Sequence, residues 1–384
     1  MKFLFASDSF KGSLTSRDTA RLLDEAAKKV FPGCETVSVP VADGGEGTVS
    51  AVVSACGGQI VTAVVCDPLK RKIDASYGIV DAGGGGRSAV IEMAAASGLT
   101  LVEDDLRDPL MTSTFGTGEL ILDALDRGCR DISIAIGGSA TNDGGMGCCR
   151  ALGIRFLDAD GTDLEGRGMD LEKVADIDIS GLDPRIKESE ITVMCDVTNP
   201  LTGPDGATMV YGPQKGASED MLKRLEAGMR NYADTVRICT GEDGSFPGAG
   251  AAGGLGFALK VFLGGVMRSG IETVLDLIDF DKLLSGVDLV VTGEGRTDRQ
   301  SCFGKVMQGV GERAAKAGVK AVGLSGSAGE GYEEIFDHGI SSLTLTMKEG
   351  LSLKEAMENA EQLYAEAAEK MFLGSRTEQA GILK

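Results

Sequence analysis

The chain of 384 residues is long enough for two domains, and its 42% hydrophobic and 25% charged residues are typical of a globular enzyme. A net charge of −20, no tryptophan and 5% aromatic residues argue against binding of nucleic acid through a basic face or by base stacking. The N-terminus shows no signal peptide, and no apolar run approaches the roughly 18 residues that a membrane span needs. We therefore expect a cytoplasmic protein with no membrane or nucleic-acid partner.

Strands and helices alternate at the N-terminus. Residues 3–6 and 36–42 are predicted strands, and each is followed by a helix. The first helix begins near Thr15-Ser16 and carries an apolar face made of Ala20, Leu23, Ala27 and Val30. The second helix follows Asp43 and includes Val49, Val52 and Val53.

The middle of the chain shows a different pattern, with three consecutive predicted strands at residues 60–67, 75–80 and 88–93. Asp81, Ala82 and four glycines separate the last two strands, which indicates a hairpin with a loose turn. Helices are expected at residues 118–126, 143–152, 218–239 and 254–262. We expect residues 76–280 to form a mixed α+β domain inserted in the first domain.

Alternation resumes near the C-terminus. Strands are predicted at 287–291, 321–324 and 343–346, and helices at 305–316 and 353–371. Such alternation indicates βαβ units with a parallel sheet, so we expect residues 1–75 and 281–384 to form an α/β domain built from both termini.

Polar, glycine-rich loops follow several of the predicted strands. In a doubly wound sheet, ligands bind beyond the carboxyl ends of the strands, where residues 8–11, 43–46, 293–298 and 325–327 fall. Lys11 and Ser13 could place an ammonium and a hydroxyl group on a phosphate. Asp43 and Glu46 are equally typical of helix-capping acids. A single loop of this kind is as often a solvated turn as a ligand site, but four together indicate one site that binds anions.

The run from Ile134 to Gly147 is the most informative of these loops. An apolar strand ends at Gly137-Gly138, small polar residues follow, and Gly144-Gly145 lead into a helix. A strand that passes through a glycine-rich turn into a helix leaves backbone N–H groups unpaired, which is a common way to hold phosphate.

Three further segments carry candidate chemistry. Asp196 comes directly after a buried strand, and such an acid suits Mg²⁺ ligation or proton abstraction, although an Asx-turn before Pro200 is the alternative. Residues 211–216 are too rich in turn formers to be core, and Lys215 is their only charge. Gly248-x-Gly250-x-x-Gly253 lacks the preceding strand of a dinucleotide site, so a phosphate loop or a tight helix start fits better.

Seven sequence blocks resemble the bacterial glycerate kinases of the type-I group. They follow one another over nearly the whole chain, at residues 9–13 (SFKGS), 40–48 (PVADGGEGT), 137–145 (GGSATNDGG), 195–201 (CDVTNPL), 212–217 (GPQKGA), 247–256 (PGAGAAGGLG) and 292–300 (TGEGRTDRQ). The chain departs from the family pattern at Val306-Met307-Gln308, where small residues and proline are expected.

The resemblance implies ATP-dependent, Mg²⁺-assisted phosphorylation of D-glycerate to 2-phosphoglycerate, in the use of glyoxylate, glucarate and related organic acids. It also implies a flavodoxin-like α/β domain, a distinct inserted domain and an active site in the cleft between them. ATP and D-glycerate are the expected small-molecule partners, and a homodimer is left open.

Residue roles follow from this resemblance together with residue type and loop position. The expected catalytic residues are Asp196, Lys11 and Asp43. Substrate binding is assigned to Ser9, Lys11, Glu46, Asn142, Asp143 and Arg296. The ATP phosphates are assigned to Gly137, Gly138, Ser139, Lys215, Gly250, Gly253 and Gly254, and Mg²⁺ to Asp196, Glu294 and Asp298. Which carboxylate binds the metal and which takes the hydroxyl proton stays open.

Three alternatives to this function remain at the level of sequence. The product could be 3-phosphoglycerate. A Mg²⁺-dependent phosphatase or mutase would share the acids and glycines, but it needs a D-x-D pattern that Asp8-Ser9-Phe10 lacks. A metabolite-binding sensor would need an appended regulatory segment, and the sequence offers none.

Overall fold

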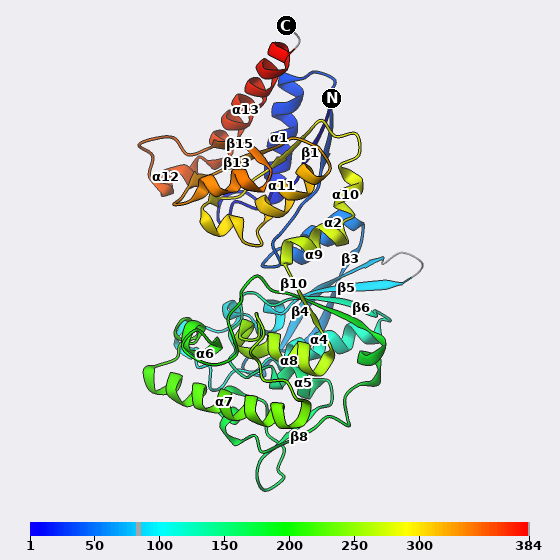
Figure 1. The fold of residues 1–384 in the computed structure, drawn as a ribbon, viewed down its shortest axis with the longest axis vertical. Helices are drawn as coiled ribbons and strands as arrows, with labels where there is room; N and C mark the ends of the chain where they lie inside the picture. The colour runs from blue at the N-terminus through cyan, green and yellow to red at the C-terminus, as the bar shows by residue number, and fades with distance from the viewer. Residues whose placement is uncertain (82–85, 383–384) are drawn as a thin grey trace. The chain divides into compact units, whose positions relative to one another are not determined.

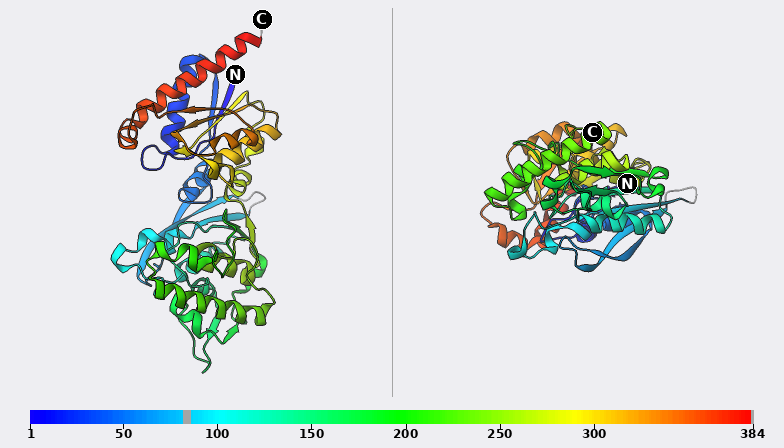
Figure 2. Two further views of the ribbon diagram at one scale, coloured as in Figure 1. Left: turned by 60° about the vertical axis from the view of Figure 1, so that its left-hand side comes forward. Right: turned by 90° about the horizontal axis from the view of Figure 1, so that it is seen from below.

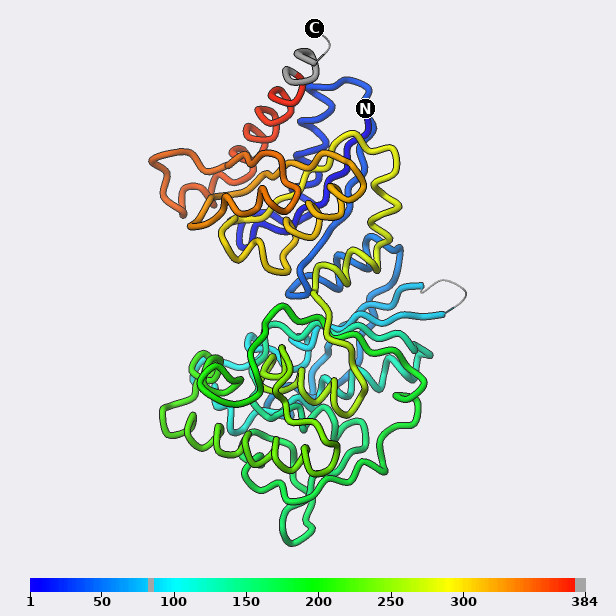
Figure 3. Tube along the Cα trace, in the orientation of Figure 1, coloured from blue at the N-terminus to red at the C-terminus, as the bar shows by residue number. Residues whose placement is uncertain are grey.

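The computed structural model describes residues 1–81 and 86–382, with side chains up to residue 376, and the chain divides into two compact units (Figure 1). The first unit contains Met1–Asp43, Ser54–Cys56 and Gly270–Lys384, and the second contains Gly44–Val53 and Gly57–Ser269. Figure 3 traces the chain, with both termini in the first unit and the cyan-to-green middle in the second. Helix α2 (Thr48–Cys56) contributes residues to both.

The first unit is built on a parallel sheet of five strands in the order β15-β13-β11-β1-β2. The strands are β1 (Lys2–Phe5), β2 (Glu35–Ser38), β11 (Leu289–Thr292), β13 (Ala321–Ser325) and β15 (Ile340–Leu345). Numbered along the unit, the order is 2-1-3-4-5, which is the flavodoxin-like order. The expected α/β fold with a parallel sheet from both termini is confirmed.

Helices cover both faces of this sheet. Successive side chains of a strand point to opposite sides, so an apolar strand such as β1 places apolar side chains on both faces. Phe3 and Phe5 pack on one face with α1 (Ser16–Val30) and α13 (Ala360–Ile382). Leu4 and Ala6 pack on the other face with α9 (Gly270–Leu277), α10 (Phe280–Leu283) and α11 (Val306–Lys316). Helix α12 (Leu353–Glu358) lies between β15 and α13 in the chain.

The second unit is built on a mixed sheet of six strands in the order β10-β9-β6-β5-β4-β3. Four neighbouring strands are parallel, whereas β4 is antiparallel to both β5 and β3. The strands are β3 (Gln59–Cys66), β4 (Lys72–Asp81), β5 (Arg87–Glu92), β6 (Asp131–Ala135), β9 (Glu190–Met194) and β10 (Val266–Arg268). A small hairpin pairs β7 (Arg155–Leu157) with β8 (Asp176–Asp178).

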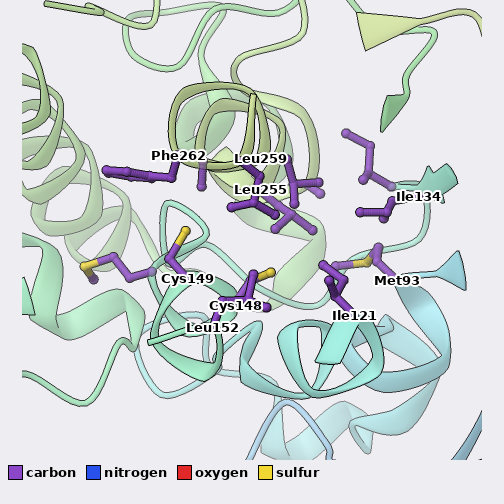
Figure 4. Packing of buried hydrophobic residues seen from close by; sticks show 14 of the residues in the cluster. Met93, Ile121, Ile134, Cys148, Cys149, Leu152, Leu255, Leu259 and Phe262 are labelled. Atoms are coloured by element: carbon purple, nitrogen blue, oxygen red, sulfur yellow. The ribbon is translucent and has the colours of Figure 1, made fainter. Parts of the chain in front are cut away.

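Short and long helices pack around the mixed sheet. They are α3 (Ala94–Ser97), α4 (Phe115–Asp126), α5 (Met146–Ala151), α6 (Ala207–Tyr211), α7 (Glu219–Thr240) and α8 (Leu255–Leu263). Figure 4 shows α5 and α8 packing through Cys148, Cys149, Leu255 and Leu259. The long helix α7 buries one face and lies on the outside of this unit (Figure 2).

The two units divide at residues other than the expected limits of 75 and 280. Strand β3 pairs along its whole length with β4, so it belongs to the mixed sheet of the second unit. Residues from Gly270 belong to the first unit, because Ile271 and Leu275 of α9 are part of its core. That each unit folds as a separate domain stays a prediction.

One local expectation differs from the structure, and a second falls partly outside the described residues. The last helix was expected as one element over 353–371, but it consists of α12 and α13, which are separated at Asn359. The antiparallel pairing of β4 with β5 is present, whereas the expected loose turn falls on residues 82–85, outside the described part of the chain.

Candidate functional site

Two acids follow neighbouring strands at the centre of the parallel sheet. Asp8 lies after β1 and Glu294 after β11, and these strands pair in parallel with Phe5 opposite Val291. The Asp8 amide donates to the Gly293 carbonyl at 2.9 Å. Because β2 lies on one side of β1 and β11 on the other, the strand order reverses here, and ligands of doubly wound sheets bind at this point.

The carboxylates of Asp8, Asp43 and Glu294 surround one lysine. Lys305 Nζ lies 3.3 Å from Asp43 Oδ2. Burial and the nearby charge of Asp43 raise the pKa of Asp8 to about 6, and burial raises the pKa of Glu294 to about 7. Burial opposes the charged form of Lys305, yet the surrounding carboxylates raise the pKa of this lysine above its ordinary value.

Glu294 is the member of this cluster that fits a cationic or hydrogen-bonding ligand. Its side chain is 9% exposed, and its Oε1 atom is buried without a hydrogen-bond partner. A buried carboxylate oxygen without a partner is costly, so a ligand that satisfied it would be favoured. Within residues 1–81 and 86–382, no three His, Cys, Asp or Glu side chains are grouped to hold a metal alone. Mg²⁺ commonly needs only one or two carboxylates besides substrate phosphates.

A pocket of about 410 Å³ opens beside this cluster, within the first unit. Its lining combines the loops after β1, β11 and β13 with the segment that leads through α12. The lining residues are Asp8, Ser9, Phe10, Lys11, Ser13, Leu14, Glu294, Gly295, Arg296, Lys305, Gly326, Ser327, Thr346, Met347, Leu353, Ala356, Met357 and Ala360. Three of the loops expected to share one edge of the sheet therefore do so.

The expected substrate and metal residues of this unit differ in exposure and in hydrogen bonding. Lys11 and Arg296 are exposed and line the pocket, and Ser9 lines it as well. Asp298 instead caps a short 3-10 helix by accepting from the Gln300 amide at 2.9 Å, and its Oδ2 lies 3.5 Å from Arg296 Nε. The expected metal role of Asp298 stays a prediction.

In the second unit, the loop after β6 has an exposed beginning and a buried end. Gly137 and Gly138 are exposed, Ser139 is nearly buried, and both Asn142 and Asp143 are completely buried. Asp143 Oδ2 accepts from the amide and hydroxyl of Thr114 at 2.7 and 2.8 Å, and Oδ1 accepts from the Gly145 amide at 3.0 Å. The structure thus gives Asp143 an internal role, which is to fix the turn that begins α5.

Lys215 is buried in the same unit, with 1% exposure. Its Nζ donates to the Thr141 carbonyl at 2.7 Å. Burial lowers the pKa of Lys215 to about 7, although the charge of Asp143 acts in the opposite direction. The expectation that residues 211–216 lie outside the core is therefore wrong at Lys215, because this side chain is buried. Its hydrogen bond stabilises the loop at Thr141.

The glycines at 250, 253 and 254 are buried and allow close packing. A Cβ atom at Gly253 would lie 2.0 Å from the Thr141 carbonyl oxygen, and one at Gly250 would lie 2.2 Å from the Pro200 carbonyl oxygen. Gly253 and Gly254 both have positive φ, immediately before α8 begins at Leu255. The segment therefore forms a tight helix start, and its expected role at the ATP phosphates stays a prediction.

Asp196 and Glu46, two acids that the sequence analysis assigns to the site, are exposed in the second unit. Asp196 is exposed directly after β9, and Glu46 is exposed before α2. The helix-capping alternative for Asp43 and Glu46 is wrong, since Gly47 is the N-cap and the Val49 amide donates to Glu92 Oε1 at 2.8 Å. The expected active site in a cleft between two domains stays a prediction.

Sequence reasoning missed several residues of the pocket. Lys305, Met347, Leu353 and Met357 are assigned to no site in the sequence analysis. Lys305 follows a glycine at the start of a helix, which is a weak signal. The apolar side chains of α12 gave no signal, because an apolar helical stripe usually faces the core.

Comparisons with known proteins identify the family of this chain. The model of the glycerate kinase family matches residues 3–374. The chain is 46% identical over 361 residues to a protein of Bacillus subtilis strain 168 named glycerate kinase, and equally to one of Escherichia coli K12 named glycerate 2-kinase, covering 94% of each chain. A crystal structure of a Salmonella typhimurium LT2 protein, provisionally named glycerate kinase 2, superposes with a TM-score of 0.88 at 43% identity, covering 99% of both chains.

Among the described residues, no helix is long and apolar enough to cross a membrane.

Proposed function

Because this chain belongs to the glycerate kinase family, we propose that it transfers the γ-phosphate of ATP to D-glycerate and forms 2-phosphoglycerate. The observation that carries the proposal is the family match over nearly the whole chain, together with relatives that are named glycerate kinase and glycerate 2-kinase. The pocket at the switch point of the parallel sheet supports it, because cations and carboxylates meet there.

Phosphoryl transfer requires mainly positioning and neutralisation of charge. We assign Lys11 and Arg296 to the anionic groups of the substrates, since both are exposed cations in the lining of the pocket. Lys305 holds Asp43 in place and adds a positive charge beside the carboxylates. In a chain with a net charge of −20, these local cations offset the repulsion that phosphate would otherwise meet.

The second unit contributes Asp196 and the exposed start of the loop at Gly137-Gly138 to the same reaction. Asp196 is the leading candidate to take the glycerate hydroxyl proton or to bind Mg²⁺, since its carboxylate is exposed at the carboxyl end of a strand. The buried Asn142, Asp143, Lys215, Gly250, Gly253 and Gly254 act on this reaction by holding the loops in shape.

Glu294 is the residue of the first unit that we assign to Mg²⁺. Its buried Oε1 atom has no partner, and carboxylate oxygens are the ligands that Mg²⁺ prefers. When bound, the metal supplies charge neutralisation at the phosphates. Asp298 is a weaker assignment, because its carboxylate caps a helix.

The family points to a place in the use of glyoxylate, glucarate and related acids, and the requirement for ATP points to the cytoplasm. A homodimer is a prediction that gel filtration with light scattering tests. Release of ADP from ATP that depends on D-glycerate would separate the kinase from a phosphatase, a mutase or a sensor. If the product is 2-phosphoglycerate, an assay coupled through enolase proceeds without a mutase, whereas a strict requirement for the mutase would identify 3-phosphoglycerate.

A further inference from the structure

The pocket of the first unit has a lining of two chemical kinds. Its charged groups come from the strand-end loops and from the start of α11, and they are Asp8, Lys11, Glu294, Arg296 and Lys305. Its apolar groups come from the loop after β1 and from the segment that follows β15, and they are Phe10, Leu14, Met347, Leu353, Ala356, Met357 and Ala360.

The apolar wall is an ordered surface of helix α12. A capping box fixes the start of this helix, in which Ser352 and Glu355 exchange side-chain and backbone hydrogen bonds. Leu353, Ala356 and Met357 follow the spacing i, i+3 and i+4, which places them along one side of α12, and Ala360 at the start of α13 adds to the same lining. Leu353 and Met357 line the pocket and remain exposed.

The loop after β1 completes the wall by packing closely on α12. A Cβ atom at Gly12 would lie 2.9 Å from Cε of Met357. Phe10 of this loop is buried, and its ring contacts the Tyr364 ring of α13 with 5.1 Å between centroids. The apolar side of the pocket is therefore built by α12, the start of α13, the β1 loop and Met347 of the segment after β15.

Glycerate alone does not account for this pocket. It is a three-carbon acid with two hydroxyl groups and presents almost no apolar surface, so an exposed apolar wall would give it no binding energy. A volume of about 410 Å³ lies in the range of pockets that hold larger ligands, roughly 300–1,000 Å³. Of the two substrates of the proposed reaction, ATP has both an apolar base and several anionic groups.

We propose that this pocket binds the adenine nucleotide, with the base and ribose against α12 and the phosphates toward Lys11, Arg296 and Lys305. The inference rests on the proposed function, which makes ATP a substrate. The sulfur atoms of Met347 and Met357 suit a flat aromatic base, because thioethers contact ring edges favourably and adapt to shape. Glu294 Oε1, buried and without a partner, then lies on the same lining as the phosphate-binding cations.

The test is calorimetric titration of the full chain with ADP and, separately, with D-glycerate. Met357→Glu places a carboxylate in the apolar wall, and Met111→Glu is the matched control, since the two methionines are 39% and 38% exposed and Met111 lies outside the pocket. We expect Met357→Glu to weaken ADP binding about tenfold or more, with D-glycerate affinity unchanged. Met111→Glu should bind both ligands as the unaltered protein does, and equal melting temperatures would show that both variants fold.

An ADP affinity unchanged in Met357→Glu would overturn the inference, and so would a selective loss of D-glycerate affinity. A second readout is photolabelling with 8-azido-ADP followed by peptide mapping. Labelled peptides should come from residues 346–360, and labelling confined to the second unit would contradict the proposal. The proposed function has a separate test. It fails if the unaltered protein releases no ADP from ATP in the presence of D-glycerate, whereas the binding data for Met357→Glu test only the position of the nucleotide.

Discussion

Lys305 and Asp43, which are 262 residues apart in the chain, form an ion pair of 3.3 Å at the carboxyl edge of the parallel sheet. The pair joins the start of α11 to the end of the segment after β2. The charges of Asp8 and Glu294 also act on this lysine and, with Asp43, raise its pKa. Lys305 thus offsets part of the negative charge of these three carboxylates.

Removal of this ammonium group should impair the reaction more than the fold. We expect Lys305→Met to lower kcat/KM by about 10²-fold, because an electrostatic group at the site of charge transfer is worth roughly that much. Steady-state kinetics with D-glycerate and ATP provide the measurement. Lys282→Met is the matched control, since Lys282 pairs with Asp279 on the surface of the same unit. Equal effects of the two substitutions would show that Lys305 has only a surface role.

The buried Lys215 should make the stability of the protein depend on pH. Its pKa is about 7 when folded and 10.5 when exposed, so between these values the unfolded chain binds more protons. Stability therefore rises with pH in this window, by about 1.4 kcal/mol per pH unit for one proton, and the destabilisation is fully present below pH 7.

Lys215→Met removes this titration. Urea unfolding at pH 7.5 and 9.0 should show that the unaltered protein gains about 2 kcal/mol relative to the variant over this interval. The comparison between the two proteins cancels the titration of the other groups. Parallel dependence on pH in both proteins would mean that Lys215 is not neutralised by burial.

Gly253 should tolerate no side chain. Gly253→Ala adds a Cβ atom 2.0 Å from the Thr141 carbonyl oxygen and forces alanine to a φ of +67°. Gly264→Ala is the control for backbone strain alone, because Gly264 has a φ of +71° at the other end of α8 with open space around it. We expect about 1 kcal/mol of destabilisation for Gly264→Ala and clearly more for Gly253→Ala, measured as melting temperatures. Equal shifts would show that the loop at Thr141 moves freely.

Asp196→Asn separates a chemical from a structural role of this acid. The substitution is nearly isosteric, so loss of a general base should lower kcat by about 10²–10⁴-fold with an unchanged melting temperature. Titration with Mg²⁺ would then show whether metal affinity or the chemical step has changed. Normal turnover with a lowered melting temperature would make Asp196 a turn residue, as the Asx-turn alternative holds.

The sequence allowed the parallel sheet and its polar edge to be predicted, because both depend on local patterns. Alternating strands and helices indicated βαβ units, and the acids after β1 and β11 follow directly from the ends of apolar runs. The division between the units was harder to place, since the pairing of β3 with β4 and the packing of Ile271 are long-range contacts.

The burial of individual side chains could not be predicted from the sequence, and this limited the prediction of the site residues. Asn142, Asp143 and Lys215 belong to residue types that are usually exposed, and only the packing around them shows that they are inside. The opposite holds for Leu353 and Met357, whose apolar side chains line a pocket. Neither case follows from residue type or spacing, because both depend on which elements meet in space.

The product of the reaction tests the central claim most directly. After incubation of the protein with ATP, Mg²⁺ and D-glycerate, proton-coupled phosphorus NMR distinguishes the two isomers, since phosphorus couples to one methine proton in 2-phosphoglycerate and to two methylene protons in 3-phosphoglycerate. We predict a new doublet that grows as ADP appears and is absent without D-glycerate. A triplet would contradict the proposed product, and formation of ADP or phosphate without any phosphoglycerate would contradict the kinase itself.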